Sequence, residues 1–355
     1  TKTEGSPDAD MKIRIRGGGS ITQDNSPLYI VDGFPVSTIN DIAPTDIASI
    51  DVLKDASSTA IYGARGANGV ILVTTKGGYE GKATVTYNMY YGVKNITKTL
   101  DVLDPYEYVF WQYEYQSTDA TSSFEKYFGD FQDMQLYKQI KGTDWQDKIL
   151  GRTGTSMYHN VTVSGGSKAS KYNLSLTHND EKEVMIGSGY TRTNLTVKTS
   201  HKVKDWLTVE FNSRLSDYKL KGAGTSSNTR LSHILQFRPV NGLMDYVDPG
   251  LTDAGDYEAS SSFVLDPLKQ TNDDYRRLNS LTFNFNGAAT VQIFKDLSYR
   301  FEYGIQYAES TNNRFYGLNT SEALTYGTQP LASIAKNDGK SYRLANIWSY
   351  RRPFL

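Results

Sequence analysis

The feature that most constrains the fold is an alternation of apolar and polar residues that begins at Lys82 and recurs to the end of the chain. In its first example, every second position from Ala83 to Val93 is apolar or aromatic. Successive side chains of a β-strand point to opposite faces, so the pattern predicts a strand with one apolar face. A repeat of about ten residues is also the length with which a tilted strand crosses an outer membrane.

The same alternation predicts eight strands in the part of the chain that follows residue 80. They cover residues 82–93, 157–165, 172–178, 191–199, 207–215, 281–293, 297–307 and, most weakly, 341–350. We expect the apolar register, which includes Phe301 and Tyr303, to face lipid. The opposite register is expected to face the polar interior that any large barrel has. It carries these charged residues: Lys198, Glu210, Arg214, Arg300 and Glu302.

The connections between these strands are alternately long and short. Transmembrane barrels have long loops on the outside and short turns on the periplasmic side, whereas a soluble β-sandwich does not require such an alternation. The long connections, predicted to lie outside, are residues 94–156, 178–190, 217–279 and 308–340. The short ones, predicted at the periplasmic rim, are residues 166–171, 200–206 and 295–296.

The first long connection contains a predicted helix. Asp104 and Pro105 suit the N-cap and the first helical position of a segment that runs to Gln116. The aromatic face of this helix, made of Tyr108, Trp111 and Tyr115, is expected to pack within the loop rather than on a partner. Taken together, however, the aromatic residues of the long loops suit a large partner interface. They are Tyr106, Tyr108, Trp111, Tyr113, Tyr115, Phe237 and Tyr246.

The part of the chain before residue 80 follows a different pattern. Three short β-branched runs bounded by turn residues predict strands at Leu28–Val31, Ile47–Leu53 and Val70–Thr75. Upstream, alternation over residues 11–16 predicts another strand with one apolar face. The glycine-rich residues 17–20 then predict a turn, since the Lys-Ser/Thr pair and the helix of a phosphate-binding loop are missing.

Glycines mark the turns of this small unit. Asp32-Gly33 predicts a tight turn, because glycine accepts a positive φ. A short helix is predicted over residues 55–62, with Asp55 as its N-cap and Gly63 as its stop. We expect Gly63, Gly66 and Gly69 to adopt a positive φ or to lie where another group approaches the backbone closely.

These residues also carry a family resemblance. The run SIDVLKDASSTAIYGARGANGVILVTTK, preceded by IRIRGGGS and PLYIVDGFPV, resembles the plug domain of TonB-dependent outer-membrane transporters. Lys54-Asp55-Ala56 stands where most of that family has Arg-Gly-Pro, and this form resembles the SusC/RagA-like branch found in Bacteroidota. The likeness is close over residues 11–78 and is one of pattern beyond them.

The resemblance implies an architecture and a function. Residues 1–80 would be the C-terminal part of a plug domain, and residues 81–355 the N-terminal part of a 22-stranded transmembrane barrel in the outer membrane of a Gram-negative cell. The whole protein would import an oligosaccharide or a peptide without covalent chemistry or a cofactor. Its partners would be a SusD-like surface lipoprotein, TonB acting through a further segment, and membrane lipid.

Composition excludes several other classes. The chain has 355 residues, a formal net charge of −1 and a mean hydropathy of −0.51. A near-neutral chain is a poor candidate for nucleic-acid binding. No apolar run reaches the roughly 18 residues that a membrane helix requires. The absence of cysteine excludes disulfides and thiolate metal sites, while 26 tyrosines and 30 glycines are typical of outer-membrane barrels.

Barrel geometry bears on how much of the wall these strands supply. The interior of a closed eight-stranded barrel is filled by its own side chains, whereas a plug needs roughly 20 or more strands around it. The eight predicted strands would therefore be part of a larger wall. On this argument we expect the chain to be a piece of a longer protein.

No residue is singled out as catalytic, metal-binding or substrate-binding. His159, His178, His201 and His233 lack metal-ligand spacing, and the first two are expected at the rim or in an aromatic girdle. Asp180, Glu181 and Glu183 suit a solvated loop tip. Ser57, Ser58 and Thr59 suit helix caps and core-facing hydroxyls, since no nucleophile-elbow motif surrounds them. Asp248, Asp253 and Asp256 lack the spacing of a calcium loop.

Two other functions remain open. A non-transporting receptor or adhesin could use the same barrel, and TonB would then be dispensable for uptake. A secreted β-rich glycan-binding protein or hydrolase would behave as a soluble protein, and a hydrolase would need a pair of catalytic acids. No such pair stands out in the sequence.

Overall fold

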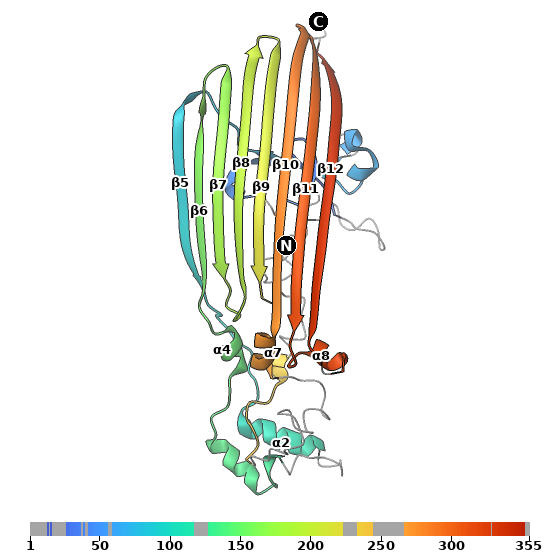
Figure 1. Ribbon diagram of the computed structural model, residues 1–355. Coiled ribbons are helices and arrows are strands. Elements are labelled where there is room, and N and C mark those ends of the chain that lie inside the picture. The colour runs from blue at the N-terminus through green and yellow to red at the C-terminus, as the bar shows by residue number, and fades with distance from the viewer. Residues whose placement is uncertain are drawn as a thin grey trace.

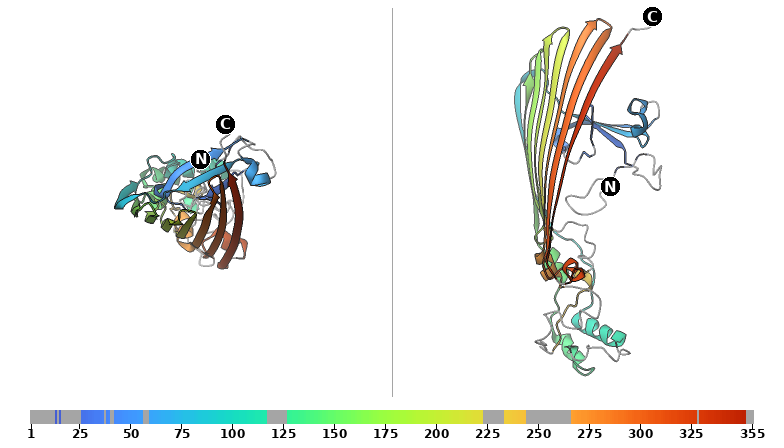
Figure 2. Two further views of the ribbon diagram at one scale, coloured as in Figure 1. Left: turned by 90° about the horizontal axis from the view of Figure 1, so that it is seen from above. Right: turned by 45° about the vertical axis from the view of Figure 1, so that its right-hand side comes forward.

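The computed structural model describes residues 13, 15, 26–36, 38–39, 42–55, 59–116, 127–222, 233–243, 266–327 and 329–351. They form two sheets, one of four strands in the order β2-β1-β4-β3 and one of eight strands in the order β12 to β5. Figure 1 shows the larger sheet, here called the wall, as a tall array of neighbouring strands. The smaller sheet, here called the plug sheet, lies against one face of the wall (Figure 2).

The plug sheet contains the three predicted strands with the predicted bounds. They are β1 (Leu28–Val31), β3 (Ile47–Leu53) and β4 (Val70–Thr75). Strand β4 lies between β1, with which it pairs in parallel, and β3, with which it pairs antiparallel. Strand β2 (Phe34–Val36) was not predicted, because it is short and contains a proline. The predicted strand and turn over residues 11–20 lie almost wholly outside the described residues.

The predicted turn conformations are confirmed. Asp32 has a φ of 46° and Gly33 a φ of 84°, so the chain reverses tightly between β1 and β2. The sheet buries Val31, Phe34, Ile71 and Val73, which form its apolar core together with neighbouring side chains. Burial of these side chains on one face is what stabilises so small a sheet.

The glycine prediction is also confirmed. Gly63 has a φ of 58° and interrupts the 3-10 segment η2 (Ala60–Gly66), so the helical turns resume beyond the predicted stop. A Cβ on Gly66 would lie 3.1 Å from the Thr59 carbonyl oxygen. Gly69 has a φ of 91°, and its Cβ would lie 2.9 Å from Ile15 Cδ1. Residues 56–58, in the middle of the predicted helix, lie outside the described part.

The wall contains all eight predicted strands, each joined antiparallel to its neighbours in the chain. Their bounds are β5 (Gly81–Lys94), β6 (Gly154–Gly166), β7 (Ser170–Lys182), β8 (Gly189–Lys204), β9 (Leu207–Lys221), β10 (Asp274–Phe294), β11 (Leu297–Tyr316) and β12 (Leu331–Tyr350). Most run well past their predicted ends. Backbone pairing such as Asn279 with Thr311 continues where neither face is apolar, so the alternation underestimates strand length.

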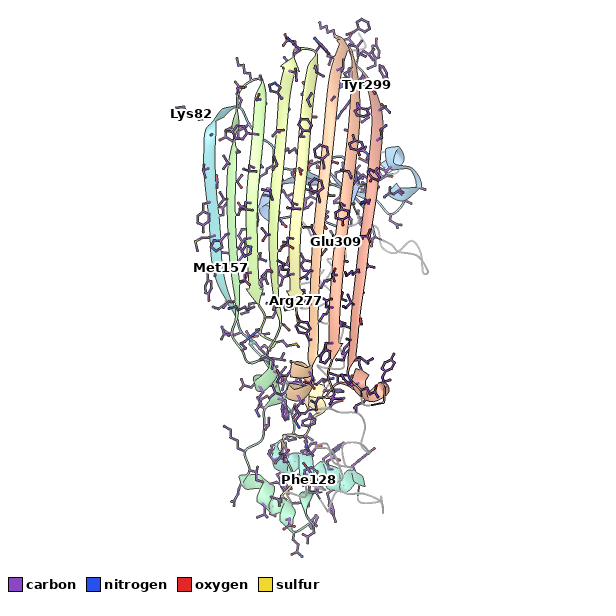
Figure 3. All side chains as sticks on the ribbon, in the orientation of Figure 1. Lys82, Phe128, Met157, Arg277, Tyr299 and Glu309 are labelled. Atoms are coloured by element: carbon purple, nitrogen blue, oxygen red, sulfur yellow. The ribbon has the colours of Figure 1, made fainter. Side chains whose placement is uncertain are left out.

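The predicted register is confirmed as well. Leu176, Phe301 and Tyr303 are 49%, 36% and 39% exposed on the face away from the plug sheet. Ser175 and Asn160, which belong to the opposite register, are buried beneath the plug sheet. Along the outward face of β11, aromatic Tyr299 lies near one end and Glu309 lies farther toward the helices (Figure 3).

The long connections lie at one end of the wall and the short turns at the other, as predicted (Figure 1). The long ones carry the helices α2 (Pro105–Gln116), η3 (Asp133–Gln139), α4 (Trp145–Leu150), α7 (Pro267–Asp273) and α8 (Ser321–Thr325). The predicted loop bounds were too wide, since strand pairing reduces residues 200–206 to a turn at Asp205 and Trp206. Within the described part of the chain, no helix has the length and apolar character needed to cross a membrane.

Helix α2 has the predicted N-terminus but a different buried face. The Glu107 amide donates to Asp104 Oδ1 at 2.7 Å, and the Asp104 amide donates to Glu107 Oε2 at 3.1 Å, which is a reciprocal capping box. Val109 is fully buried in a small core with Phe128, Met134 and Tyr137, and Tyr108 packs against it.

The expectation that the whole aromatic face of α2 packs within the loop is wrong for two of its three residues. Trp111 is 50% and Tyr115 71% exposed, and their rings stack on one another at 5.4 Å. The reason is helical spacing, because the residues that share a face with Val109 are Tyr106 and Tyr113.

Gly69 provides a test of the plug sheet. We expect Gly69→Ala to lower the stability of this sheet by roughly 1–3 kcal/mol, because an alanine there must hold a positive φ and displace Ile15. The matched control is Gly77→Ala, since a Cβ at Gly77 meets nothing within 4 Å. Hydrogen exchange of the Leu28 amide, which donates to the Gly69 carbonyl, measures the effect. Equal exchange in the two variants would contradict the prediction.

Candidate functional site

The chemically distinctive part of the molecule is the surface where the plug sheet meets the wall. Two rows of inward-facing side chains cross the wall at right angles to its strands. The first row is Asn173, Lys198, Asn212, Asn286, Gly304 and Arg343, and the second is Ser175, Thr196, Arg214 and Asn284. The plug sheet sets one aspartate on each row.

Asp32 lies in the tight turn between β1 and β2 and sits on the first row. Its Oδ1 accepts a hydrogen bond from Lys198 Nζ at 2.8 Å and from the Thr75 amide at 3.0 Å. Its Oδ2 accepts from Thr75 Oγ1 at 2.6 Å and from Asn212 Nδ2 at 2.5 Å. The Asp32 side chain is only 7% exposed, so an ion pair between plug sheet and wall is largely withdrawn from water.

The surroundings of Asp32 favour its charged form. Burial alone would raise the pKa of this carboxyl. The Lys198 charge and the hydrogen bonds from Lys198 and Thr75 act in the opposite direction and prevail, so the pKa of Asp32 lies below its ordinary value. The ion pair therefore stays formed at neutral pH.

Asp46 sits on the second row, at the end of the 3-10 turn η1 (Pro44–Asp46). It is 3% exposed and accepts hydrogen bonds from Ser175 Oγ at 2.5 Å and Thr196 Oγ1 at 2.9 Å. Next to it, Thr45 Oγ1 and the Tyr158 hydroxyl are 2.6 Å apart. Among the described residues, no cation lies within ion-pair distance of Asp46, so hydroxyl groups alone hold its carboxylate.

A chain of charges extends the first row toward β12. Arg343 NH1 contacts the Gly33 carbonyl oxygen of the plug turn and lies 2.9 Å from Glu302 Oε2. Arg300 Nε lies 2.7 Å from Glu302 Oε1, and its NH1 contacts Glu210. The structure thus brings together four of the five charged residues that the sequence placed in the inward register.

The fifth of these residues, Arg214, is not in the chain of charges. It is 7% exposed, and neither NH1 nor NH2 has a hydrogen-bond partner. Its cross-strand neighbour Asn284 is 2% exposed, and both polar atoms of that amide are likewise unpartnered. This cluster lies beside the row on which Asp46 rests.

Glycines allow the plug sheet to approach the wall. A Cβ on Gly304 of β11 would lie 2.5 Å from Phe34 Cδ2, so the buried Phe34 ring occupies the place of a side chain. Gly78, in the connection 76–80 between β4 and β5, lies so close to the Tyr172 backbone that a Cβ would be 2.2 Å from its nitrogen. A cavity of about 340 Å³ remains between plug sheet and wall, lined in part by Asp32, Lys198, Glu210 and Arg300.

The histidines take part in hydrogen bonds rather than in a shared site. His159 and His178 face each other across β6 and β7 on the outward face, where they bond to Tyr87 and Thr193. His201 bonds to Ser170, and the buried His233 to Gln270. Within the described ranges, no three His, Asp or Glu side chains gather as a metal ion would require.

The expected acidic loop tip is wrong. Asp180 and Glu181 belong to strand β7, because pairing with β8 continues to Lys182. Lys94 Nζ lies 2.5 Å from Glu181 and 3.0 Å from Glu183, so these acids form ion pairs at the strand ends. The expected capping role of Thr59 is wrong, because its hydroxyl donates to the Asp55 carbonyl four residues back and accepts no hydrogen bond from the described η2 backbone. Ser57, Ser58 and residues 248–256 lie outside the described residues.

The sequence did not identify Asp32 and Asp46 as interface residues. The Asp32-Gly33 pair predicts only a turn, and no pattern around Asp46 marks that residue. Lys198 is 166 positions away from Asp32 along the chain, and pairing over that distance has no local signature. The available signal was weaker: an aspartate in a tight turn, and a lysine in the inward register of a predicted strand.

Known proteins resemble the chain at several levels. The family model of the TonB-dependent receptor plug domain matches residues 1–70. TonB-dependent receptor P3 of Formosa agariphila is 32% identical over 310 residues, which cover 85% of this chain and 28% of that protein. TonB-dependent receptor SusC of Bacteroides thetaiotaomicron is 28% identical over 355 residues, covering 89% and 34%. The chain thus spans only about a third of the length of these relatives.

Solved structures resemble the fold. The RagAB peptide importer in its closed-closed state matches 99% of this chain and 42% of the importer chain, with a TM-score of 0.77 and 22% identity. Its open-open state matches 98% and 41%, with a TM-score of 0.75 and 23% identity. At this identity the likeness is one of fold, and it extends over both the plug sheet and the wall.

The Asp32–Lys198 pair can be tested by substitution and by pH. We expect Asp32→Asn to weaken docking of the plug turn by on the order of 3 kcal/mol, because it leaves a half-buried lysine unpaired. Since the folded-state pKa of Asp32 is lowered, its contribution is complete above about pH 4 and is lost as the pH falls through that lower value.

Hydroxyl-radical oxidation of Tyr158, a wall side chain that is 8% exposed and whose hydroxyl contacts Thr45 Oγ1, measures both effects. Asp51→Asn, an exposed carboxylate on β3, is the control and should change little. Docking that is insensitive to Asp32→Asn and to acid would show that the ion pair is not what holds the turn.

The observations converge on one family. A small mixed sheet with the plug-domain sequence lies on the polar face of an antiparallel wall, and long and short connections separate to opposite ends of that wall. The Lys54-Asp55-Ala56 form of the plug sequence points to the SusC/RagA-like branch, and relatives that include SusC match most of the chain. The chain belongs to the SusC-like TonB-dependent receptors.

Proposed function

We propose that the protein of which this chain is part imports an oligosaccharide or a peptide across the outer membrane of a Gram-negative cell. TonB supplies the energy, and a SusD-like surface lipoprotein acts as partner. Residues 1–80 serve as plug and residues 81–355 as barrel wall. The observation that carries the proposal is the plug sheet docked on the inward face of the wall through the Asp32–Lys198 pair.

The need for energy follows from this contact. Displacing the plug turn separates the Asp32–Lys198 ion pair, and Asp46 gives up two further hydrogen bonds when it leaves Ser175 and Thr196. A lumen closed in this way does not conduct a large solute passively. An applied force that displaces the plug turn would open it, which is the role that TonB has in this proposal.

The end of the wall that carries the helices supports the choice of partner. Trp111 and Tyr115 are exposed there on α2, and large aromatic side chains of this kind are enriched in protein interfaces. The other aromatic residues of these loops argue less for a partner, since Tyr106 and Tyr113 pack on the α2 core and Phe237 on Trp145. The partner surface therefore centres on Trp111.

Membrane insertion is supported by the outward face, where apolar side chains continue from strand to strand. Catalysis has no place in the proposal, because the relatives are receptors and because most of the charged groups on the plug side are paired with one another. A peptide cargo is favoured by the fold shared with the RagAB peptide importer, and an oligosaccharide is the other cargo that the family resemblance of the sequence implies.

Uptake by cells with and without TonB tests the proposal. We expect a labelled oligopeptide or oligosaccharide to enter cells that carry the complete transporter, and uptake to fall to background when TonB is deleted. Deletion of the neighbouring lipoprotein should reduce uptake as well. Undiminished uptake without TonB would support the receptor or adhesin alternative. Detergent-independent solubility of the whole protein would support the secreted alternative.

The orientation of the wall gives a separate prediction. Phe301→Arg, on the outward face of β11, should lower stability in the membrane by about 2–4 kcal/mol, because it puts a cation into lipid. Ser298→Arg, in the inward register of the same strand, should cost little. Unfolding of the two variants in lipid vesicles measures the difference. Labelling of a cysteine at position 301 by aqueous reagents only would contradict the assignment.

A further inference from the structure

Among the five charged residues that the sequence places in the inward register, Arg214 is the one whose charged nitrogens NH1 and NH2 have no partner in the described part of the chain. It lies in the middle of β9, in the second row, between Thr196 and Asn284. It is only 7% exposed, yet neither NH1 nor NH2 has a hydrogen-bond partner. Both polar atoms of Asn284 and Nδ2 of Asn194 are also unpartnered. The neighbouring side chains of Arg214, Asn284 and Asn194 therefore have hydrogen-bonding atoms that no group satisfies in the docked state.

The cost of this arrangement is high. Arginine keeps its charge in proteins, so it does not escape burial by losing a proton. An unpaired charge or amide in a buried position costs several kcal/mol unless a partner is gained in some state of the protein. A residue that served only to hold the plug sheet would be bonded to it, as Lys198 and Asn212 are.

The charges around Arg214 indicate what kind of partner fits. The wall near the plug turn carries the cations Lys198, Arg300 and Arg343 against the acids Glu210 and Glu302. Two carboxylates from the plug side offset the excess of positive charge. Asp32 accepts a hydrogen bond from Lys198, and Asp46 accepts one from Thr196, which pairs directly across from Arg214. When the plug turn leaves the wall, it takes these carboxylates away and uncovers a surface with an excess of cations and amide donors.

We propose that Arg214, together with Asn284 and Lys198, binds carboxylate groups of the solute while the plug sheet is displaced. This inference rests on the proposed import function and adds the chemical class of its cargo: an oligomer that bears carboxylates. A guanidinium fork and a neighbouring amide donor match the two oxygens of a carboxylate. Acidic side chains of a peptide and uronic acids of an oligosaccharide supply the same group, and the experiment separates these sources.

The test uses linkage between binding and plug displacement. A ligand that binds only the displaced state increases the population of that state, by about tenfold when its concentration is ten times its dissociation constant. Hydroxyl-radical oxidation of Tyr158 reports displacement, since this wall side chain is 8% exposed and its hydroxyl contacts Thr45 Oγ1 in the docked state. The full-length transporter is measured with hexaglutamate or hexaglutamine, and with trigalacturonate or its neutral counterpart trigalactose, at matched ionic strength.

We expect the carboxylate member of at least one pair to accelerate the oxidation of Tyr158 and its neutral counterpart to have no such effect. Arg214→Gln should reduce the acceleration at least fivefold, Arg214→Lys should retain part of it, and Lys336→Gln, an exposed cation on the outward face, should leave it unchanged. The responding pair identifies a peptide or a glycan source.

Several outcomes would overturn the inference. They are equal acceleration by charged and neutral probes, no acceleration by any probe, and an unchanged response in Arg214→Gln. Because oxidation of Tyr158 is measured without TonB, its result is independent of the uptake experiment. A melting temperature of Arg214→Gln at or above that of the unmodified protein is also expected, since the docked state makes no bond to Arg214. A fall similar to that of Lys198→Gln would mean that Arg214 serves docking instead.

Discussion

The arrangement of this molecule depends on a charge that is buried where two sheets meet. Asp32 is withdrawn from water, and it tolerates this because Lys198, Asn212 and Thr75 together replace its hydration. The turn that presents Asp32 requires a positive φ at two successive residues, the pairing of β8 with β9 brings Lys198 beside Asn212, and Gly304 leaves room for Phe34. Local conformation, strand register and side-chain volume therefore all serve one contact. Replacing any of them would affect the position of the plug sheet on the wall.

Much of the fold could be predicted because its signals are local. The strands β1, β3 and β4 have sharp boundaries, since turn residues flank their β-branched runs. The wall strands were found from alternation alone, but β10, β11 and β12 extend far beyond it. Their outer parts carry Asn279, Thr311 and Lys336 on the outward face, and such residues give no contrast between the two registers. Strand β2 was missed because a three-residue strand with a central proline carries too little pattern.

The candidate site was predicted only in part, and for a physical reason. Alternation assigns Lys198, Arg214 and Arg300 to one face of the wall, because side-chain direction is a property of each strand alone. It does not indicate which of these residues meets the plug sheet. That depends on how two independently formed sheets dock, and therefore on contacts such as Asp46 with Ser175 between residues 129 positions apart. The difference between a paired Lys198 and an unpaired Arg214 arises at this level.

The short connection between the sheets limits how the plug can move. Strand β4 occupies the interior of the plug sheet, and residues 76–80 join it directly to the first strand of the wall. Fully extended, these residues span at most about 17 Å, so the end of β4 remains near β5 whatever force is applied. Gly78, fitted against the Tyr172 backbone, fixes the midpoint of the connection in the docked state. A displaced plug sheet would accordingly rotate about residues 76–80, and the edge farthest from this connection would move the most.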